Sequence, residues 1–169
     1  GTTVKYNPGS NYSFKNNITL YAVYKSKVRI RVKDVVTGMV ISNGNWTNKP
    51  VTIELENAQN ILYRIGETSY TAYTNKFTYM NEGSTTLYAK PSDSSIISQY
   101  NINIDTTVPT TPGNINVTKN STDSFTAEAS GSTDSLSGVA GYEYSVDGVN
   151  YQSSGIFNDM ENKRYQVYA

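Results

Sequence analysis

Apolar and polar residues alternate along most of this chain, and this two-residue period restricts it to a β-sheet fold. In the segment 28–33, Val28, Ile30 and Val32 fall on one face of an extended strand and three cations on the other. Successive side chains of a strand point to opposite faces, so this pattern predicts a half-buried strand. No segment keeps a 3.6-residue period over ten residues, and we therefore predict an all-β protein. Five segments share the alternation: 18–24, 28–33, 51–56, 100–105 and 142–147.

Turn-forming residues separate these predicted strands. Asn and Gly tolerate the positive φ angles that tight turns require. Asp147-Gly148 is typical of a two-residue hairpin turn between Val146 and the segment after it. Short strands at such spacing predict an antiparallel sandwich. The other turn signals are Asn7-Pro8-Gly9, Asn43-Gly44-Asn45 and Asn81-Glu82-Gly83.

The chain contains an internal repeat. Tyr63 and Tyr70 match Tyr144 and Tyr151, each 81 positions later. Because the matched residues occur in the same order at an almost constant spacing, they predict tandem copies of a single β-module. Further along, the spacing becomes 80 for four pairs: Phe77 with Phe157, Met80 with Met160, Tyr88 with Tyr168, and Ala89 with Ala169.

The second copy carries a longer loop than the first. Upstream of Tyr142, the segment 51–55 matches 125–129 at a spacing of 74, so about seven extra residues fall in the polar loop 130–138. One interpretation is that surface loops tolerate insertions, and we favour it because no site chemistry accompanies this loop. The other is that the loop recognises something.

These observations divide the chain into three parts. Residues 1–27 are the predicted remnant of a β-rich repeat, 28–107 a complete module, and 108–169 a second module that lacks its last strand. The boundary at 108–113 holds two prolines and a glycine, which do not fit inside a sheet. Gly1 and a strand-like segment at 165–169 predict a piece cut from a longer protein. We expect strand addition or dimerisation at the edge around Tyr165, where backbone groups would be unpaired.

The amino-acid composition argues against several classes of function. The chain has 14 basic and 14 acidic residues, no His and no Cys. Zero net charge argues against nucleic acid or an anionic membrane as partner, since both need a basic surface. Thiol nucleophiles, disulfides and imidazole bases are absent from the sequence, and no apolar run reaches about 18 residues. We therefore predict a protein that is not an enzyme, has no cofactor and does not insert into a membrane.

Two family resemblances follow from particular motifs. Residues 1–9 followed by 17–24 resemble the final half of a Listeria–Bacteroides repeat, the internalin-type B repeat, with Tyr24 in place of its usual final Trp. The remainder resembles bacterial immunoglobulin-like surface modules. Its motifs are Trp46–Thr52, Tyr63–Gly66, Leu87–Ala89 and Ile104–Pro109 in the first copy and Tyr142–Gly148 in the second.

The second resemblance implies an architecture and a location. The fold would be tandem immunoglobulin-like or fibronectin III-like β-sandwiches, and the parent a large secreted or wall-anchored bacterial protein. The chain would then be extracellular, at the bacterial cell wall surface, with neighbouring modules of the same polypeptide as its partners. The resemblance implies no catalytic residues.

Three aromatic residues form the candidate ligand-binding set: Trp46, Tyr63 and Tyr70. Aromatic rings combine a large apolar surface with a polar edge, so Trp46 with nearby tyrosines could hold a host glycan or protein. The alternative is that Trp46 covers the core or contacts the next module, since Trp is usually well buried.

We make two further predictions about charged residues. The cations of 28–33 should pair with Glu54 and Glu56 if their strands are neighbours. Asp105, Asp134 and Asp147 are candidates for a calcium site at a module junction. Calcium needs six to eight oxygen ligands, and no closely spaced run of carboxylates supplies them.

The sequence thus favours a non-catalytic spacer or stalk module. Two alternatives stay open. One is an adhesive module for a host glycan or protein, and the other is an accessory module of a secreted glycoside hydrolase.

Overall fold

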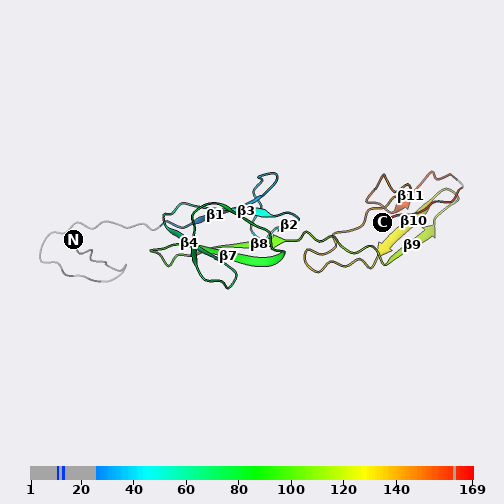
Figure 1. Cartoon of the computed structure of the whole chain (residues 1–169). Coiled ribbons are helices and arrows are strands. Elements are labelled where there is room, and N and C mark those ends of the chain that lie inside the picture. The colour runs from blue at the N-terminus through cyan, green and yellow to red at the C-terminus, as the bar shows by residue number, and fades with distance from the viewer. Residues whose placement is uncertain (1–10, 12, 14–25, 162) are drawn as a thin grey trace.

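The computed structural model describes residues 11, 13, 26–161 and 163–169. All regular elements in this part of the chain are β-strands, which confirms the predicted all-β class. They form an N-terminal unit of residues 28–105 and a C-terminal unit of residues 113–169, joined by the linker 106–112 (Figure 1). None of the described residues belongs to a helix that could span a membrane. The predicted remnant and its repeat resemblance lie almost wholly outside the described residues.

Two sheets face each other in the N-terminal unit. One has the strand order β1-β3-β6 and the other β2-β8-β7-β4-β5. Every pairing is antiparallel except the short parallel contact of β2 with β8. The strands are β1 (Arg29–Asp34), β2 (Trp46–Thr47), β3 (Val51–Glu56), β4 (Ile61–Ile65), β5 (Thr71–Ala72), β6 (Phe77–Tyr79), β7 (Gly83–Pro91) and β8 (Ser98–Ile104).

Alternate residues of both sheets meet in one apolar core. Ile53 of β3 and Leu87 of β7 have no exposed surface. Full burial of an aliphatic side chain contributes about 1.5–3 kcal/mol, so this interior is the main source of stability for the unit. The inward faces predicted for 28–33 and 51–56 are confirmed. The remaining buried members are Val28, Val32, Val51, Leu55, Ile61, Ala89, Ile102 and Ile104.

An aromatic cluster joins the two sheets at one side of this core. The ring of Tyr63, on β4, stacks on that of Phe77, on β6, with centroids 4.8 Å apart. Tyr73 meets Tyr63 edge-on at 6.2 Å. Such ring pairs add about 0.5–1.5 kcal/mol beyond the area they bury. The cluster therefore fixes the two sheets relative to each other.

Ion pairs line the outer face of the smaller sheet. β1 and β3 are neighbours, with Arg31 opposite Glu54 in the register. The Lys33 ammonium lies 2.7 Å from a Glu54 oxygen, and the Arg31 Nε lies 3.2 Å from a Glu56 oxygen. The predicted cross-strand pairing is thus confirmed. Partly exposed pairs of this kind contribute little to stability and mainly favour one register.

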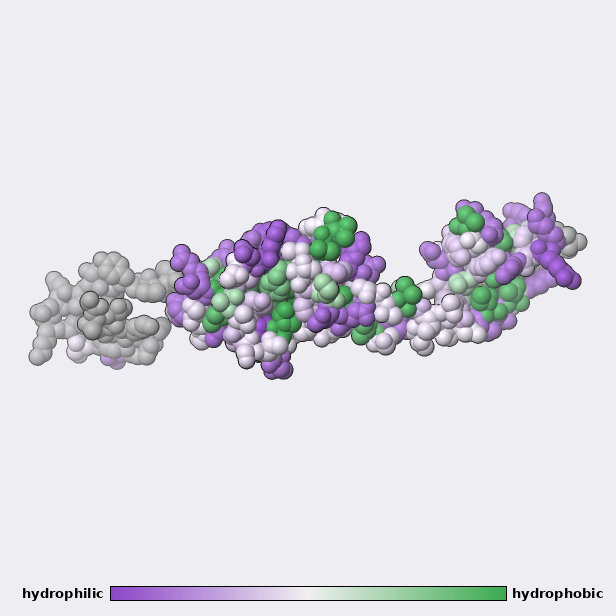
Figure 2. Space-filling model, viewed as in Figure 1, coloured by the Kyte–Doolittle hydropathy of each residue, from purple (hydrophilic) through white to green (hydrophobic). Residues whose placement is uncertain are grey.

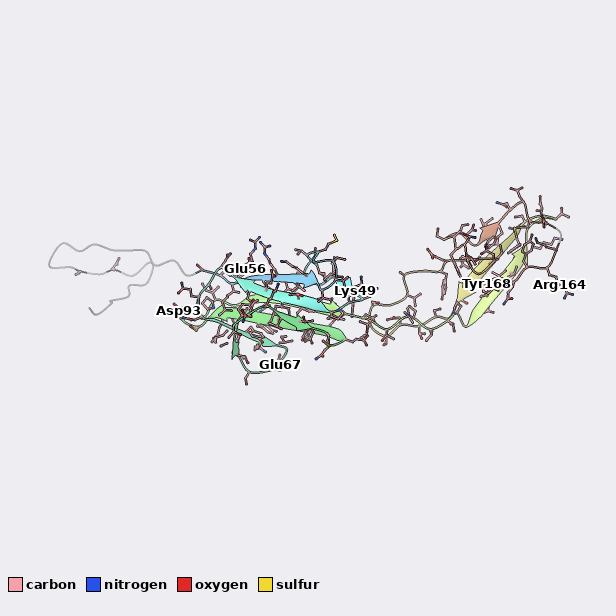
Figure 3. The ribbon with its side chains drawn as sticks, turned by 45° about the horizontal axis from the view of Figure 1, so that its top comes forward. Lys49, Glu56, Glu67, Asp93, Arg164 and Tyr168 are labelled. Atoms are coloured by element: carbon pink, nitrogen blue, oxygen red, sulfur yellow. The ribbon has the colours of Figure 1, made fainter. Side chains whose placement is uncertain are left out.

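The C-terminal unit has a three-stranded sheet in the order β11-β10-β9. Ala127 and Phe157 of this sheet are buried, as is Ser145 outside it, and the rings of Phe125 and Phe157 stack at 5.0 Å. Two isolated bridges, Tyr144 with Gln152 and Ser145 with Tyr168, connect the rest of the unit. Figure 3 labels Tyr168 in this unit. The strands are β9 (Asn114–Lys119), β10 (Phe125–Ser130) and β11 (Ile156–Phe157).

The predicted two-residue hairpin at Asp147-Gly148 is wrong. The first paired residues on its two sides are Tyr144 and Gln152, so the loop spans 145–151. The Asp147 carboxylate accepts hydrogen bonds from the backbone N–H groups of Val149 and Asn150, both at 2.8 Å. These bonds hold the pKa of Asp147 far below its usual range. A side chain that bonds the backbone ahead of it organises a wider loop instead of a tight turn.

We expect Ile53→Ala to lower the free energy of unfolding of the N-terminal unit by about 2–5 kcal/mol, because it leaves a cavity between the sheets. Trp46 is the only tryptophan of the chain and lies in the same unit, so its fluorescence during urea unfolding reports the change. Val36→Ala is the control, since Val36 is 72% exposed and its replacement should change stability by less than about 0.5 kcal/mol. An unchanged urea midpoint for Ile53→Ala would contradict this account of the core.

Candidate functional site

The three candidate ligand-binding residues do not form one site. Trp46 lies on β2, at one edge of the five-stranded sheet, while Tyr63 lies on β4 and Tyr70 directly precedes β5 at the other edge. β8 and β7 separate the two edges. At about 4.8 Å per strand, three strand spacings put roughly 14 Å between β2 and β4. A single sugar ring cannot contact both.

Trp46 and Tyr63 have different surroundings. Trp46 is 38% exposed at the sheet edge, opposite Asn103 in the β2–β8 register. It therefore covers part of the unit and leaves part of its ring in solvent. Tyr63 stacks on Phe77 and is an inter-sheet contact. Of the two, Trp46 alone offers its ring to a ligand.

Tyr70 belongs to a cluster of cations and aromatic rings on the outer face of the larger sheet. The Arg64 guanidinium lies 4.0 Å from the centroid of the Tyr88 ring and 5.6 Å from that of Tyr70. Lys90 Nζ lies 4.8 Å from the Tyr70 ring. Cations over ring faces contribute about 0.5–1 kcal/mol at exposed sites. These faces are thus occupied by the protein's own cations.

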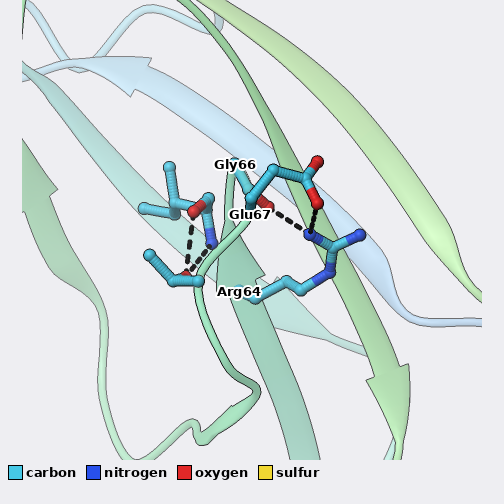
Figure 4. Close-up of polar contacts among 5 residues, drawn as sticks. Arg64, Gly66 and Glu67 are labelled. Carbon is cyan, nitrogen blue, oxygen red and sulfur yellow. Dashed lines mark hydrogen bonds and ion pairs between the residues drawn. The ribbon is translucent and has the colours of Figure 1, made fainter.

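Arg64 organises this cluster, and the sequence analysis did not identify it. Its guanidinium donates to the carbonyl oxygen of Gly66 and lies 3.6 Å from a Glu67 oxygen (Figure 4). Thr68 closes the same turn by donating its hydroxyl to the Ile65 carbonyl at 2.9 Å. The alternation along β4 places Arg64 outward, but its nearer aromatic partner, Tyr88, comes from the neighbouring strand β7, so the local sequence could not reveal it.

The loop 35–40 presents apolar side chains to solvent. Asp34 Oδ1 accepts hydrogen bonds from the N–H groups of Val36 and Thr37, at 2.7 and 2.8 Å. These bonds lower the pKa of Asp34, with the Thr37 N–H as the main cause, and Gly38 completes the turn at φ +70°. The loop is therefore ordered by its own backbone. Figure 2 shows apolar surface at its tip, formed by Val36, Met39 and Val40, which are 72%, 71% and 63% exposed.

The linker is bound to the end of the N-terminal unit. Glu82 Oε1 accepts the N–H of Thr106 at 2.8 Å and the hydroxyl groups of Thr106 and Thr107. These bonds, the Thr106 hydroxyl first, lower the pKa of Glu82. The linker and residues 137–143 line an open groove of about 680 Å³. Among the described residues, the apolar core of the N-terminal unit includes no residue of the C-terminal unit, and a hydrogen bond from Ser137 to Asp105 joins the two units.

The three aspartates proposed for calcium are also engaged with the backbone. Asp105 lies at the start of the linker and accepts from Thr107 N–H at 3.1 Å, and Asp134 accepts from Leu136 N–H at 2.8 Å. Asp147 lies in the separate loop 145–151. Across the described ranges, no group of three or more His, Cys, Asp or Glu side chains is arranged to hold a metal ion.

Comparisons with known proteins add no family to this picture. No family model, curated protein or solved structure matches the chain. The features that bear on function are therefore the strand pairings, the apolar loop 35–40 and the linker between the two units.

Proposed function

We propose that this chain is a non-catalytic spacer made of tandem immunoglobulin-like modules, part of a larger bacterial surface or secreted protein. In such a protein the function of each module is mechanical. Each module keeps its shape through its own core, and each junction sets the direction of the next module.

The observation that carries this proposal is a strand pairing that recurs at the spacing of the sequence repeat. Tyr63 pairs with Thr71 in the N-terminal unit, and Tyr144 pairs with Gln152, each 81 positions later. Arg64 pairs with Tyr88, and their counterparts Ser145 and Tyr168, 81 and 80 positions later, form a bridge. Equal spacing in both sequence and pairing favours one module used twice.

The three-stranded sheets of the two units also share the same strand order. β1-β3-β6 and β9-β10-β11 both place the second strand at the centre. One difference is a shift of register. Ile53 lies opposite Phe77, whereas Phe125, and not Ala127, lies opposite Phe157. A two-residue shift keeps the same face inward, so it preserves the core pattern.

The strand order of the N-terminal unit supports the immunoglobulin-like assignment. Without the short strands β2 and β5, the chain order is β1, β3, β4, β6, β7 and β8. The first, second and fourth of these form one sheet, and the third, fifth and sixth lie in the other, with the fifth between the third and the sixth. Immunoglobulin-type sandwiches divide strands A, B and E from C, F and G in this way.

Small-angle X-ray scattering of the whole chain tests the spacer function. A compact globule of 169 residues would have a radius of gyration of about 15 Å. We expect a clearly larger value and a pair-distance distribution with a long tail, because the two units share no core. A value near that of the compact globule would overturn the proposal.

An adhesive module is the second candidate, and the apolar loop 35–40 favours it. Exposed apolar side chains on an ordered loop are typical of protein contact sites. Val36 and Met39 would lose water on contact with an apolar surface of a host protein. The half-exposed Trp46 would serve the same function towards a glycan.

We expect the variant Val36→Ser/Met39→Ser to lose at least tenfold in affinity for any matrix protein that the unchanged chain binds. A panel of immobilised matrix proteins and a glycan array would be the measurement, with Trp46→Ala as the glycan variant. Val149→Ser is the matched control, because Val149 is 78% exposed but lies in the C-terminal unit. Equal binding by all variants, or no binding by the unchanged chain, would sink the adhesive candidate.

A further inference from the structure

The extra loop of the C-terminal unit lies against the linker. β10 ends at Ser130, and residues 131–141 follow before the segment that begins at Tyr142. The corresponding connection in the N-terminal unit, between β3 and β4, is only Asn57–Asn60. The sequence left two interpretations of this difference, a tolerated insertion or a recognition loop. The contacts of the loop decide between them.

The first contact is made by Asp105, the last residue before the linker. Its side chain is almost fully buried, at 5% exposure. Oδ2 accepts the backbone N–H of Ser137 at 2.9 Å, and Oδ1 accepts that of Thr107 at 3.1 Å. Hydrogen bonds from Ser137 are the main cause of the lowered pKa of this carboxyl. One carboxylate thus joins the end of the N-terminal unit to the loop of the C-terminal unit.

The second contact lies five residues further along the linker. Thr110 N–H donates to the Thr133 carbonyl at 3.0 Å, and Thr133 N–H donates to the Thr110 hydroxyl at 2.8 Å. Two separate contacts, at Asp105 and at Thr110, resist rotation of the loop about either one. A single hydrogen bond would leave that rotation free.

The loop is also ordered from within its own unit. Ser132 N–H donates to the Tyr142 hydroxyl at 3.1 Å, and Asp134 Oδ1 accepts from Gly138 N–H at 3.1 Å. Gly131, at φ +85°, lies against the backbone of Gly113, where a Cβ atom would stand 3.4 Å from Gly113 Cα. An ordered loop loses little conformational entropy when it binds the linker.

We propose that residues 131–138 are an inter-module clamp, which recognises the buried Asp105 carboxylate of the preceding module and Thr110 of the linker and fixes the angle between the two units. The inference deepens the proposed spacer function and rests on it. The partner is defined by its chemistry: a module that ends in a buried carboxylate followed by a threonine-rich extended segment. The joint is directional, because the short Asn57–Asn60 connection of the N-terminal unit cannot make the same contacts.

Double electron–electron resonance tests the clamp on the whole chain. The absence of native Cys permits one spin label in each unit, through Gln99→Cys on β8 and Thr118→Cys on β9, both exposed strand positions. We expect a single narrow distance distribution for this labelled chain. In the same background, Asp105→Ala should broaden the distribution at least twofold.

A second variant and a control keep the test independent of folding. Replacing 131–141 with the Asn57–Asn60 sequence removes the clamp from the other side and should broaden the distribution as much. Asp123→Ala is the control, since Asp123 Oδ1 accepts the Ser121 hydroxyl within the C-terminal unit, and it should leave the width unchanged. Urea unfolding followed both through Trp46 and by circular dichroism shows whether the two units of each variant are folded.

Two outcomes would overturn the clamp. One is a broad distribution for the labelled chain itself, and the other is an unchanged width in both the Asp105→Ala and the loop-replacement variants. Either would leave the spacer function standing if scattering still shows an extended chain, because a flexible joint can also separate two modules. A compact scattering profile would instead remove the spacer function, so the two failures are distinguishable.

Discussion

The burial of one face of each sheet against the other is the constraint on which the rest of this structure depends. β3 and β7 lie in different sheets, yet their side chains Ile53 and Leu87 share one interior with no exposed surface. Sheets with one apolar face are stable only when that face is covered. This requirement leaves the outer faces and the loops free to vary. The Arg31 and Lys33 ion pairs, the Arg64 cluster and the apolar loop 35–40 all lie outside the shared core.

The joint between the units is stabilised differently from their cores. Apolar burial is strong but has no direction, whereas hydrogen bonds require particular distances and angles. Glu82 accepts the N–H of Thr106 in the linker. Asp105 accepts the N–H of Ser137, and the Thr110 hydroxyl accepts that of Thr133, both in the loop 131–138. A buried carboxylate that loses its partner carries a large desolvation cost, so the Asp105 contact penalises other orientations of the C-terminal unit. Hydrogen bonds at the joint thus set the orientation of the two units without burying much apolar surface.

The parts of the fold that depend on a local period could be predicted from the sequence, and the parts that depend on distant partners could not. Alternation identified the strands at 28–33 and 51–56 and put Arg31 and Lys33 on the outer face that also carries Glu54 and Glu56, because a period of two fixes which residues share a face. The hairpin at Asp147 failed because the carboxylate bonds ahead along its own backbone. Trp46, Tyr63 and Tyr70 were proposed as one ligand set, but strand order separates the first from the other two. The partner of Ser137 lies 32 positions away, at Asp105, and no local pattern of the loop 130–138 indicates it.

In the proposed array of one module, identical ends would let any copy follow any other, which is a problem that a single domain does not have. Differences between copies must then define the order of modules. In this chain the connection after β10 is longer than the one after β3, and the longer version contacts Asp105 and the linker residue Thr110. Surface loops accept extra residues at little cost to the core. Specificity for a neighbouring module can therefore be added in this loop without altering the strand pairing that both units share. The length and contacts of the loop at each joint would then determine how stiff the array is.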